Sequence, residues 1–330
     1  MTSQHVVVIG VGSIGERHTR CFQATGRTQV SIVESNASLA DEISKRYGVT
    51  AYSDINAALA QRPTAAVIAT PAPLHIAQAI QLVEAGVNVL IEKPLSISIE
   101  GVDRLQALAT ERKSIIGVAY VLRAYPVLAA MRNALQSSRF GTPRQITALC
   151  GQHFPTYRPA YREIYYANRA AGGGAIQDAL THMVNMGEWL VGPVDRLVAD
   201  AEHLVLPGVE VEDTVHLVTR QGAVMGNYSL NQHQAPNETI LTVNCDHGTV
   251  RCEMHNNRWM WMTKPGEPWQ EESFGTAERD TAFIAQANAF LDALEGKRPV
   301  LCPLEQGIQT LKVNIAALES VERRAWVSIN

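Results

Sequence analysis

The feature that most restricts the fold is a glycine pattern, Gly10-x-Gly12-x-x-Gly15, placed between an apolar strand and a helix. The residues before it, 5–9, read HVVVI, a run of β-branched side chains typical of a buried strand. Glycine at these positions permits a tight turn, a close approach of the backbone to a pyrophosphate, and packing of helix on strand. The helix that follows directs unpaired N–H groups at the phosphates. The pattern therefore predicts a dinucleotide-binding site.

Short apolar strands alternate with helices throughout residues 1–120. Further strands are expected at 29–33, 65–70, 88–92 and 114–120, and further helices at 37–47, 74–85 and 99–112. These strands do not alternate apolar with polar residues, as expected when helices cover both faces of a parallel sheet. Repeated strand–helix units predict right-handed crossovers and a doubly wound sheet.

Residues 121–330 show a different pattern. Stretches that alternate in polarity are expected to be strands at 144–154, 213–220, 223–230, 238–245, 248–254 and 258–262. Such alternation predicts a largely antiparallel sheet with one covered face, and Asn256-Asn257 supplies a hairpin turn. Helices are expected near 279–294 and 304–323. The chain of 330 residues is thus expected to be α/β, with an N-terminal Rossmann domain at 1–120 and a C-terminal α+β domain with a large, open, mostly antiparallel sheet at 121–330.

Charge and cysteine content restrict the partners and the compartment. The net charge of −4, with both signs mixed, is unlike that of nucleic-acid-binding proteins, so we expect no nucleic-acid partner. Apolar runs end well before the roughly 18 residues that a membrane span needs. Five scattered cysteines without a CxxC pair indicate reduced thiols. We therefore expect a cytoplasmic protein with no membrane segment and no signal peptide.

Glu34 closes the second predicted strand, about 20 residues after the glycine pattern. A carboxylate at this place accepts hydrogen bonds from the ribose of the adenosine half of a dinucleotide. It also repels a 2′-phosphate, and the next residues, Ser35 and Asn36, provide no arginine to hold one. NAD is therefore favoured over NADP, although Arg17 and Arg20 lie in the neighbouring helix.

Several stretches together resemble the Gfo/Idh/MocA oxidoreductases, the family of glucose–fructose oxidoreductase and inositol dehydrogenase. They are GVGSIGERH (10–18), ATPAPLH (69–75), EKP (92–94) and GGGAIQDALTH (172–182). The resemblance implies that the first domain binds NAD(P) and that the second carries the substrate site and subunit contacts. It implies that Lys93, Asp178 and His182 form the active site, and that the Lys93–Pro94 bond is cis. The cofactor-binding residues expected from motif and resemblance are Gly10, Gly12, Ser13, Ile14, Gly15, Glu34, Thr70, Pro71, Glu92 and Lys93.

The chemistry of the expected active site agrees with this resemblance. Asp178 and His182 are four residues apart in a stretch, 175–190, that reads as a helix, so both side chains share one face. The carboxylate can then orient the imidazole, and an alcohol oxidation needs a base for the hydroxyl proton. Lys93 would hold the substrate oxygen or share the proton relay. The residues themselves leave open whether Lys93 or His182 takes the proton.

Two stretches bear on the substrate. One is 118–126, with Arg123, and the other is 154–174, rich in tyrosine and arginine. Tyrosine and arginine offer stacking surfaces and hydrogen-bond donors that suit polyols, sugars or sugar acids. The candidate substrate-binding residues are Arg123, Tyr157, Arg158, Tyr161 and Arg162. The alternative is a loop held together by its own ion pairs.

The sequence therefore predicts an NAD(P)-dependent oxidoreductase that moves a hydride between a nicotinamide cofactor and a secondary alcohol or ketone of a sugar or polyol. A homodimer or homotetramer is expected, and no metal. One alternative is a redox-neutral sugar elimination in which NAD is regenerated in each cycle. Another is a non-enzymatic NAD-binding sensor, which would have no use for the set of Lys93, Asp178 and His182.

Overall fold

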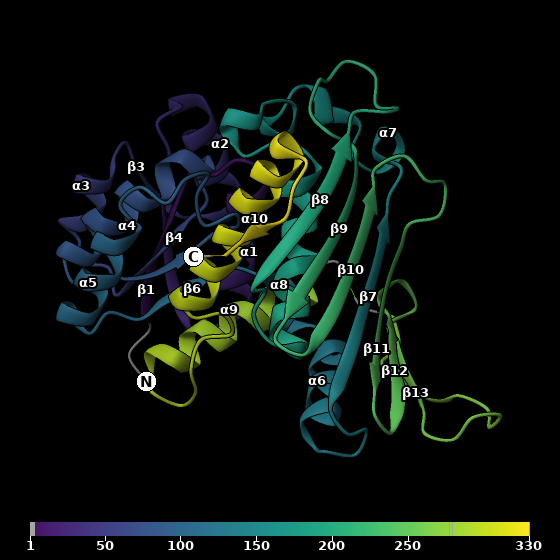
Figure 1. Ribbon diagram of the computed structural model, residues 1–330. Coiled ribbons are helices and arrows are strands. Elements are labelled where there is room, and N and C mark those ends of the chain that lie inside the picture. Colours follow the sequence, from purple (N-terminus) through teal and green to yellow (C-terminus); the bar gives the residue numbers. More distant parts are fainter. Residues whose placement is uncertain (1–3, 277, 279, 330) are drawn as a thin grey trace. The chain divides into compact units, whose positions relative to one another are not determined.

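A computed structural model describes residues 4–276, 278 and 280–329. The chain divides into two compact units, each built on one sheet (Figure 1). The first unit comprises Met1–Ala124 and Glu278–Ile308, and the second comprises Tyr125–Ala277 and Gln309–Asn330. The C-terminal part of the chain thus contributes to both units.

The first unit contains a six-stranded sheet whose strands all run parallel. The order is β3-β2-β1-β4-β5-β6. The chain adds β2 and β3 on one side of β1 and then crosses to the other side of β1, where it adds β4, β5 and β6. The strands are β1 (Gln4–Ile9), β2 (Thr28–Val33), β3 (Thr50–Tyr52), β4 (Ala65–Ile68), β5 (Asn88–Ile91) and β6 (Ile116–Val118). This order is that of dinucleotide-binding doubly wound sheets, and it confirms the predicted fold class.

Helices of the first unit are α1 (Ser13–Ala24), α2 (Ala37–Tyr47), α3 (Ile55–Leu59), α4 (His75–Glu84), α5 (Val102–Arg112) and α9 (Thr281–Leu294). Local chemistry sets their ends, as in α2, where the Asn36 side chain accepts from Leu39 N–H and Gly48 ends the helix at φ 65°. In the core, Phe22 of α1 meets Phe290 of α9 edge to face, with ring centroids 6.5 Å apart. Helix α9 therefore belongs to the core of this unit.

The second unit contains a nine-stranded sheet in the order β14-β13-β12-β11-β7-β10-β9-β8-β15. The strands are β7 (Pro143–Gly151), β8 (Arg196–Glu202), β9 (Thr214–Gln221), β10 (Val224–Asn231), β11 (Glu238–Cys245), β12 (Gly248–Glu253), β13 (Arg258–Met262), β14 (Gln270–Ser273) and β15 (Val327–Ser328). Neighbours run antiparallel, except that β7 and β10 are parallel. The predicted open, mostly antiparallel sheet is confirmed, as is the β12–β13 hairpin, where Asn257 has φ 47°.

Three longer helices accompany this sheet: α6 (Pro126–Gln136), α8 (Thr181–Val191) and α10 (Leu304–Arg323). Helices α8 and α10 lie along the same face of the sheet (Figure 1): α8 packs on β7 and β10, and the N–H of Ala199 in β8 donates to Ser320 of α10 at 2.9 Å. Buried polar contacts join them: Asn185 donates to Thr310 at 2.9 Å, and Asn314 donates to Thr181 at 2.9 Å. Helix α8 is thereby held in one place between the sheet and α10.

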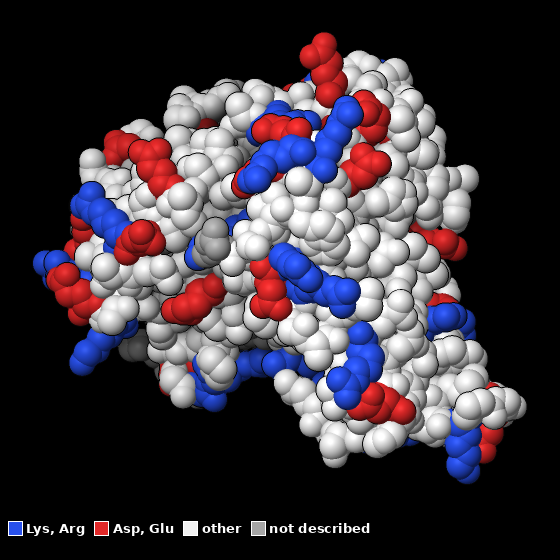
Figure 2. Space-filling view, in the orientation of Figure 1, with Lys and Arg blue, Asp and Glu red and all other residues white. Residues whose placement is uncertain are grey.

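Charged side chains of both signs lie interspersed on the face shown in Figure 2. This mixture agrees with the small net charge of −4. Within the described ranges, none of the helices combines the length and the apolar composition that crossing a bilayer requires.

Candidate active site

The glycine pattern forms the turn between β1 and α1. Gly10 has φ 79°, a left-handed conformation, and a Cβ on Gly15 would lie 1.8 Å from the Gly10 carbonyl oxygen. Glycine is therefore required at both positions, one for the turn and the other for the contact of helix with turn. Gly12 is exposed, and a Cβ there would meet nothing within 4 Å. Its bare backbone leaves room for a pyrophosphate.

Glu34 follows the last residue of β2 and reaches the glycine turn. Its Oε2 accepts the backbone N–H of Val11 at 3.0 Å, and its Oε1 accepts that of Asn36 at 2.9 Å. The half-buried carboxylate is thus held beside the loop that would cradle the phosphates. This arrangement suits NAD, since ribose hydroxyls can donate to the same carboxylate.

Thr70 and Pro71 follow β4 at the same carboxyl edge of the sheet. The Thr70 hydroxyl donates to Gln78 at 2.7 Å, and Pro71 is exposed. In open parallel sheets, ligands bind outside the carboxyl ends of the strands. The position of both residues is therefore compatible with the predicted contact to a cofactor.

Glu92, Lys93 and Pro94 form the turn that follows β5. The Lys93–Pro94 peptide bond is cis, as predicted, and the Lys93 residue is half-buried. Glu92 is 5% exposed, and its carboxylate accepts from His18 Nε2 at 2.6 Å and from Lys93 N–H at 3.0 Å. Both carboxylate oxygens thus bond to groups of the first unit, and the contact of Glu92 with the cofactor stays a prediction.

Three consecutive glycines precede the helix that carries the other candidate catalytic residues. Gly172 and Gly174 both have φ 91°, and a Cβ on Gly173 would lie 2.2 Å from the Tyr166 carbonyl oxygen. A Cβ on Gly174 would lie 2.5 Å from Oε1 of Glu212. That oxygen accepts the N–H of Ile176 at 3.0 Å, so the glycines let the start of the helix rest on a buried carboxylate.

Gly174→Ala is expected to lower the free energy of unfolding by about 2 kcal/mol or more. The left-handed backbone alone costs about 1–2 kcal/mol for a residue with a Cβ, and the contact with Glu212 adds to it. Urea unfolding followed by circular dichroism measures the change. The matched control is Gly266→Ala, because Gly266 has φ 84° but nothing lies within 4 Å of an added Cβ. Equal losses in both variants would show that the approach to Glu212 is not tight.

Asp178 lies in a π-helical stretch, Ile176–Leu180, which leads directly into α8. The predicted helix is present, but its first part is π-helical. The Asp178 side chain is 0% exposed, and its carboxylate accepts from Tyr165 OH at 2.5 Å and from Arg158 Nη1 at 2.8 Å. The neighbouring Asp178 raises the pKa of the Arg158 guanidinium. His182 is half-buried in the first turn of α8.

The tyrosines of the segment 154–171 divide into two groups. Tyr161 and Tyr166 are buried in a small core with Phe154, where the ring centroids of Phe154 and Tyr166 are 5.1 Å apart. Tyr157 and Tyr165 are 51% and 40% exposed. The structure thus brings Arg158 and Tyr165 to Asp178, and Tyr165 was not singled out from the sequence. Its membership of the tyrosine-rich stretch was the only available signal.

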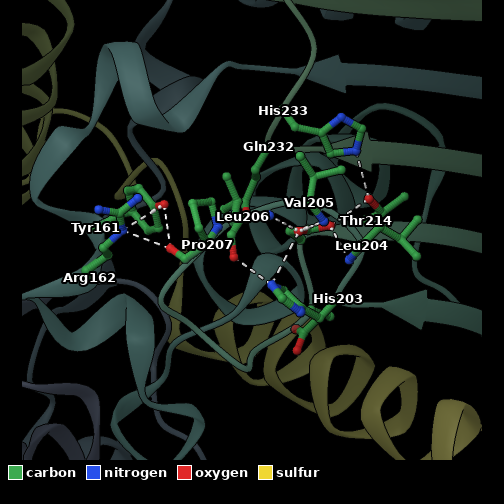
Figure 3. Close-up of polar contacts among 12 residues, drawn as sticks. Tyr161, Arg162, His203, Leu204, Val205, Leu206, Pro207, Thr214, Gln232 and His233 are labelled. Atoms are coloured by element: carbon green, nitrogen blue, oxygen red, sulfur yellow. Dashed lines mark hydrogen bonds and ion pairs between the residues drawn. The ribbon is translucent and has the colours of Figure 1, made fainter.

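Arg162 and Tyr161 are fixed by the loop 203–207. The Pro207 carbonyl accepts from Arg162 Nε and from Tyr161 OH, each at 2.8 Å (Figure 3). That loop is itself held by Asp213, which is 0% exposed and accepts the consecutive N–H groups of residues 204–206. Burial raises the pKa of the Asp213 carboxyl, but these backbone donors outweigh it and the pKa is lowered. The Arg162 guanidinium is therefore held through Nε by the loop 203–207, which Asp213 itself fixes.

Arg123 occupies a different kind of position. It lies in the first unit, is 3% exposed, and donates from Nη1 to the carbonyl of Leu301 at 3.0 Å and to Gln306. These contacts join the segment after β6 to Leu301, which precedes α10, and to the first turn of α10. Lys93 also belongs to the first unit, whereas Asp178, His182 and the tyrosine–arginine segment belong to the second.

Comparison with known proteins identifies the family to which the chain belongs. Residues 4–120 match the profile of an oxidoreductase family with an NAD-binding Rossmann fold, and residues 128–251 match that of the GFO/IDH/MocA C-terminal domain. The chain belongs to the Gfo/Idh/MocA family. The two profile matches confirm the resemblance that the glycine turn, the EKP turn and the glycine-led helix indicated in the sequence.

Individual relatives agree over nearly the full length. The chain is 27% identical to UDP-N-acetylglucosamine 3-dehydrogenase of Acidithiobacillus ferrooxidans, covering 94% of each chain. It is 23% identical to levoglucosan dehydrogenase of Pseudarthrobacter phenanthrenivorans, covering 100% of this chain and 99% of the relative. A solved structure of levoglucosan dehydrogenase with NADH and levoglucosan superposes with a TM-score of 0.90 at 20% identity, covering 99% of this chain and 100% of that one.

Proposed function

We propose that this family member is an NAD-dependent dehydrogenase that oxidises a secondary alcohol of a sugar or sugar derivative. The observation that carries the proposal is the buried Asp178 carboxylate, held by Arg158 and Tyr165 one helical turn before His182. A buried carboxylate held by two donors from a tyrosine–arginine segment suits a site for a polyhydroxylated ligand. The dehydrogenase relatives, which are named for levoglucosan and UDP-N-acetylglucosamine, support the same substrate class.

The cofactor is proposed to lie on the glycine turn, with Gly12 beneath the pyrophosphate and Glu34 at the adenosine ribose. Bound there, NAD supplies the acceptor for the hydride that leaves the alcohol carbon. We propose that His182 takes the hydroxyl proton and that Asp178, fixed by its two donors, supports that proton transfer. We propose that the Lys93 ammonium stabilises the negative charge that develops on the substrate oxygen.

The proposed function is tested by incubating the protein with NAD and, in turn, levoglucosan, UDP-N-acetylglucosamine and myo-inositol. The expected result is accumulation of NADH with at least one of them, followed by absorbance. NADH that never accumulates while a sugar product forms would instead favour a redox-neutral elimination. NAD binding without any turnover of a sugar or polyol would favour a sensor and contradict the proposal.

Glu34→Ala is expected to lower the ratio of NAD to NADP affinity by on the order of tenfold. The carboxylate is proposed to accept from the ribose, and a hydrogen bond to a charged group is worth about 1.5–3 kcal/mol. Its loss also removes the repulsion of a 2′-phosphate. Calorimetric titration with both cofactors measures the ratio, and Glu42→Ala, at an exposed site in α2, is the control. An unchanged ratio would show that Glu34 does not select the cofactor.

We also propose that the protein is a homo-oligomer, assembled through the sheet face opposite α8. Strand register places Val218, Met225 and Leu149 on one face, where they are 38%, 48% and 48% exposed. Exposed apolar side chains on a sheet favour burial against a second copy. Met225→Glu is expected to lower the mass measured by light scattering after gel filtration. An unchanged mass would rule out this face.

A cytoplasmic location is proposed from the cysteines. The five cysteines, all within the described residues, are thiols outside any disulfide (Cys21, Cys150, Cys245, Cys252 and Cys302), which suits a reducing compartment.

A further inference from the structure

We propose that His18 is a positioning residue for Lys93, and that it ties the dinucleotide-binding helix α1 to the lysine turn. This inference rests on the proposed function of Lys93 at the substrate oxygen and on the sequence-based expectation that Lys93 also contacts the cofactor. His18 stands three residues after Gly15, on the helix that the glycine turn opens. Its imidazole Nε2 lies 2.6 Å from Oε1 of Glu92, so the residue links two segments that are 74 positions apart in sequence.

The contact is buried on both sides. His18 is 1% exposed and Glu92 is 5% exposed. A carboxylate only accepts hydrogen bonds, so the imidazole proton lies on Nε2 and the ring donates to Glu92. The ring also packs edge to face against Phe283 of α9, with centroids 5.7 Å apart, and this contact restricts its orientation. The hydrogen bond to Glu92 and the packing on Phe283 therefore fix the position of the His18 imidazole.

The other oxygen of Glu92 acts on Lys93 itself. Oε2 accepts the backbone N–H of Lys93 at 3.0 Å, so one carboxylate joins the imidazole to the main chain of the lysine. A second histidine acts on the next residue: the ring of His75 lies between the carbonyl oxygens of Pro94 and Thr70, at 3.1 and 2.8 Å. Burial lowers the pKa of His75, so the ring is neutral and its one N–H serves one carbonyl at a time.

The hydrogen bond from His18 to Glu92 is expected to be stronger than the bond that His75 makes to a backbone carbonyl. Donation to a carboxylate is stronger than donation to a neutral carbonyl, and a buried carboxylate that loses its donor must find another. Removal of the His18 imidazole is therefore expected to turn the Glu92 carboxylate away and release the Lys93 backbone. His18 itself then acts only through Glu92 and Lys93. The glycine turn, by contrast, keeps the contacts of Gly10, Gly15 and Glu34.

The placement of the Lys93 amine can be measured with NAD alone. Acetic anhydride acetylates exposed lysine amines, and mass spectrometry of the peptides gives a rate for each lysine. At an NAD concentration about 100 times its Kd, roughly 1% of the protein is free, which permits a slowing of up to about 100-fold, and acetylation of Lys93 is expected to slow by at least about tenfold. In His18→Leu, NAD is expected to bind still, but the ratio of rates without and with NAD should fall toward one. Acetylation of exposed Lys113 is the internal reference.

Two further variants separate positioning from folding. His18→Gln places an amide donor near the same point and is expected to restore most of the protection of Lys93. His5→Leu removes a comparable bond, from His5 Nε2 to Ser31 at 2.8 Å, at the amino end of β1, and should leave the protection unchanged. Thermal unfolding reports whether each variant is folded. If His18→Leu does not fold, the test is the ratio of Lys93 acetylation rates without and with NAD in His18→Gln. A ratio near one in that variant would overturn the inference.

The remaining outcomes are also decisive. Full protection of Lys93 in His18→Leu would overturn the inference and leave the proposed function intact. Loss of NAD binding in His18→Leu would mean that His18 supports the glycine turn and not Lys93, and it would also overturn the inference. If NAD binds the wild-type protein but leaves the acetylation rate of Lys93 unchanged, the proposed role of Lys93 is contradicted, and so is the inference.

Discussion

Lys93→Met is expected to lower kcat by on the order of 10²–10³-fold, because the side chain keeps its length but loses its positive charge. Stabilising the charge that develops on the substrate oxygen acts in the transition state, so the loss should appear in kcat and kcat/KM together. The Kd for NAD should stay close to that of the wild type, since the phosphates are proposed to bind the glycine turn. Steady-state kinetics with the substrate found by NADH formation, and calorimetric titration of NAD, measure the two quantities.

The control for this variant is Lys45→Met, which removes an exposed lysine of the same unit that pairs with Asp41 at 2.5 Å on the surface of α2. It should leave both quantities unchanged. If Lys93→Met instead raised KM with an unaltered kcat, the lysine would bind the substrate equally in its ground and transition states. A catalytic role would then be excluded.

The parallel sheet was predictable because its sequence signal is local and repeated. Uninterrupted apolar runs such as VVVI at 6–9 must be covered on both faces, and the glycine turn fixes which strand comes first. Strand β3, with three residues, and α3, with five, escaped prediction because elements so short carry no measurable period. The alternation in β9 and β10 similarly revealed a sheet with one covered face.

Other parts of the fold depend on contacts between distant segments. Nothing in the residues of α9 indicates that Phe290 packs on Phe22, because an apolar helix face does not name its partner. The π-helical stretch before α8 is equally hidden, since its residues are ordinary helix formers. The glycines at 172–174 did mark the start of the helix, but the reason for them, a close approach to Glu212, requires the structure.

The candidate site follows the same division. Residues within one motif, such as Gly10 and Glu34, could be proposed as cofactor contacts because their spacing is that of dinucleotide-binding sites. The side-chain partners of Asp178 and Glu92 were not predicted, because Tyr165 is 13 positions from Asp178 and His18 is 74 positions from Glu92. Sequence spacing predicts contacts along one helix or one turn, whereas these contacts arise only when the elements pack.

His182→Ala is expected to lower kcat by about 10²-fold or more, in line with the loss of a general base. The half-buried imidazole lies on the first turn of α8, four residues after the buried Asp178 carboxylate, and alanine removes the ring without disturbing a good helix position. The Kd for NAD should remain near that of the wild type, because the proposed cofactor contacts lie in the other unit.

Free imidazole added to the His182→Ala protein should restore part of the lost turnover, which a merely structural histidine would not allow. The matched control is His247→Ala, an exposed histidine of the turn between β11 and β12 in the same unit, whose loss should leave kcat unchanged with or without imidazole. Wild-type turnover in His182→Ala would make the residue structural and transfer the proton to another group, with Lys93 the first to examine. Lost turnover that imidazole never restores, in a variant with wild-type thermal stability, would instead mean that the ring orients the substrate without moving its proton.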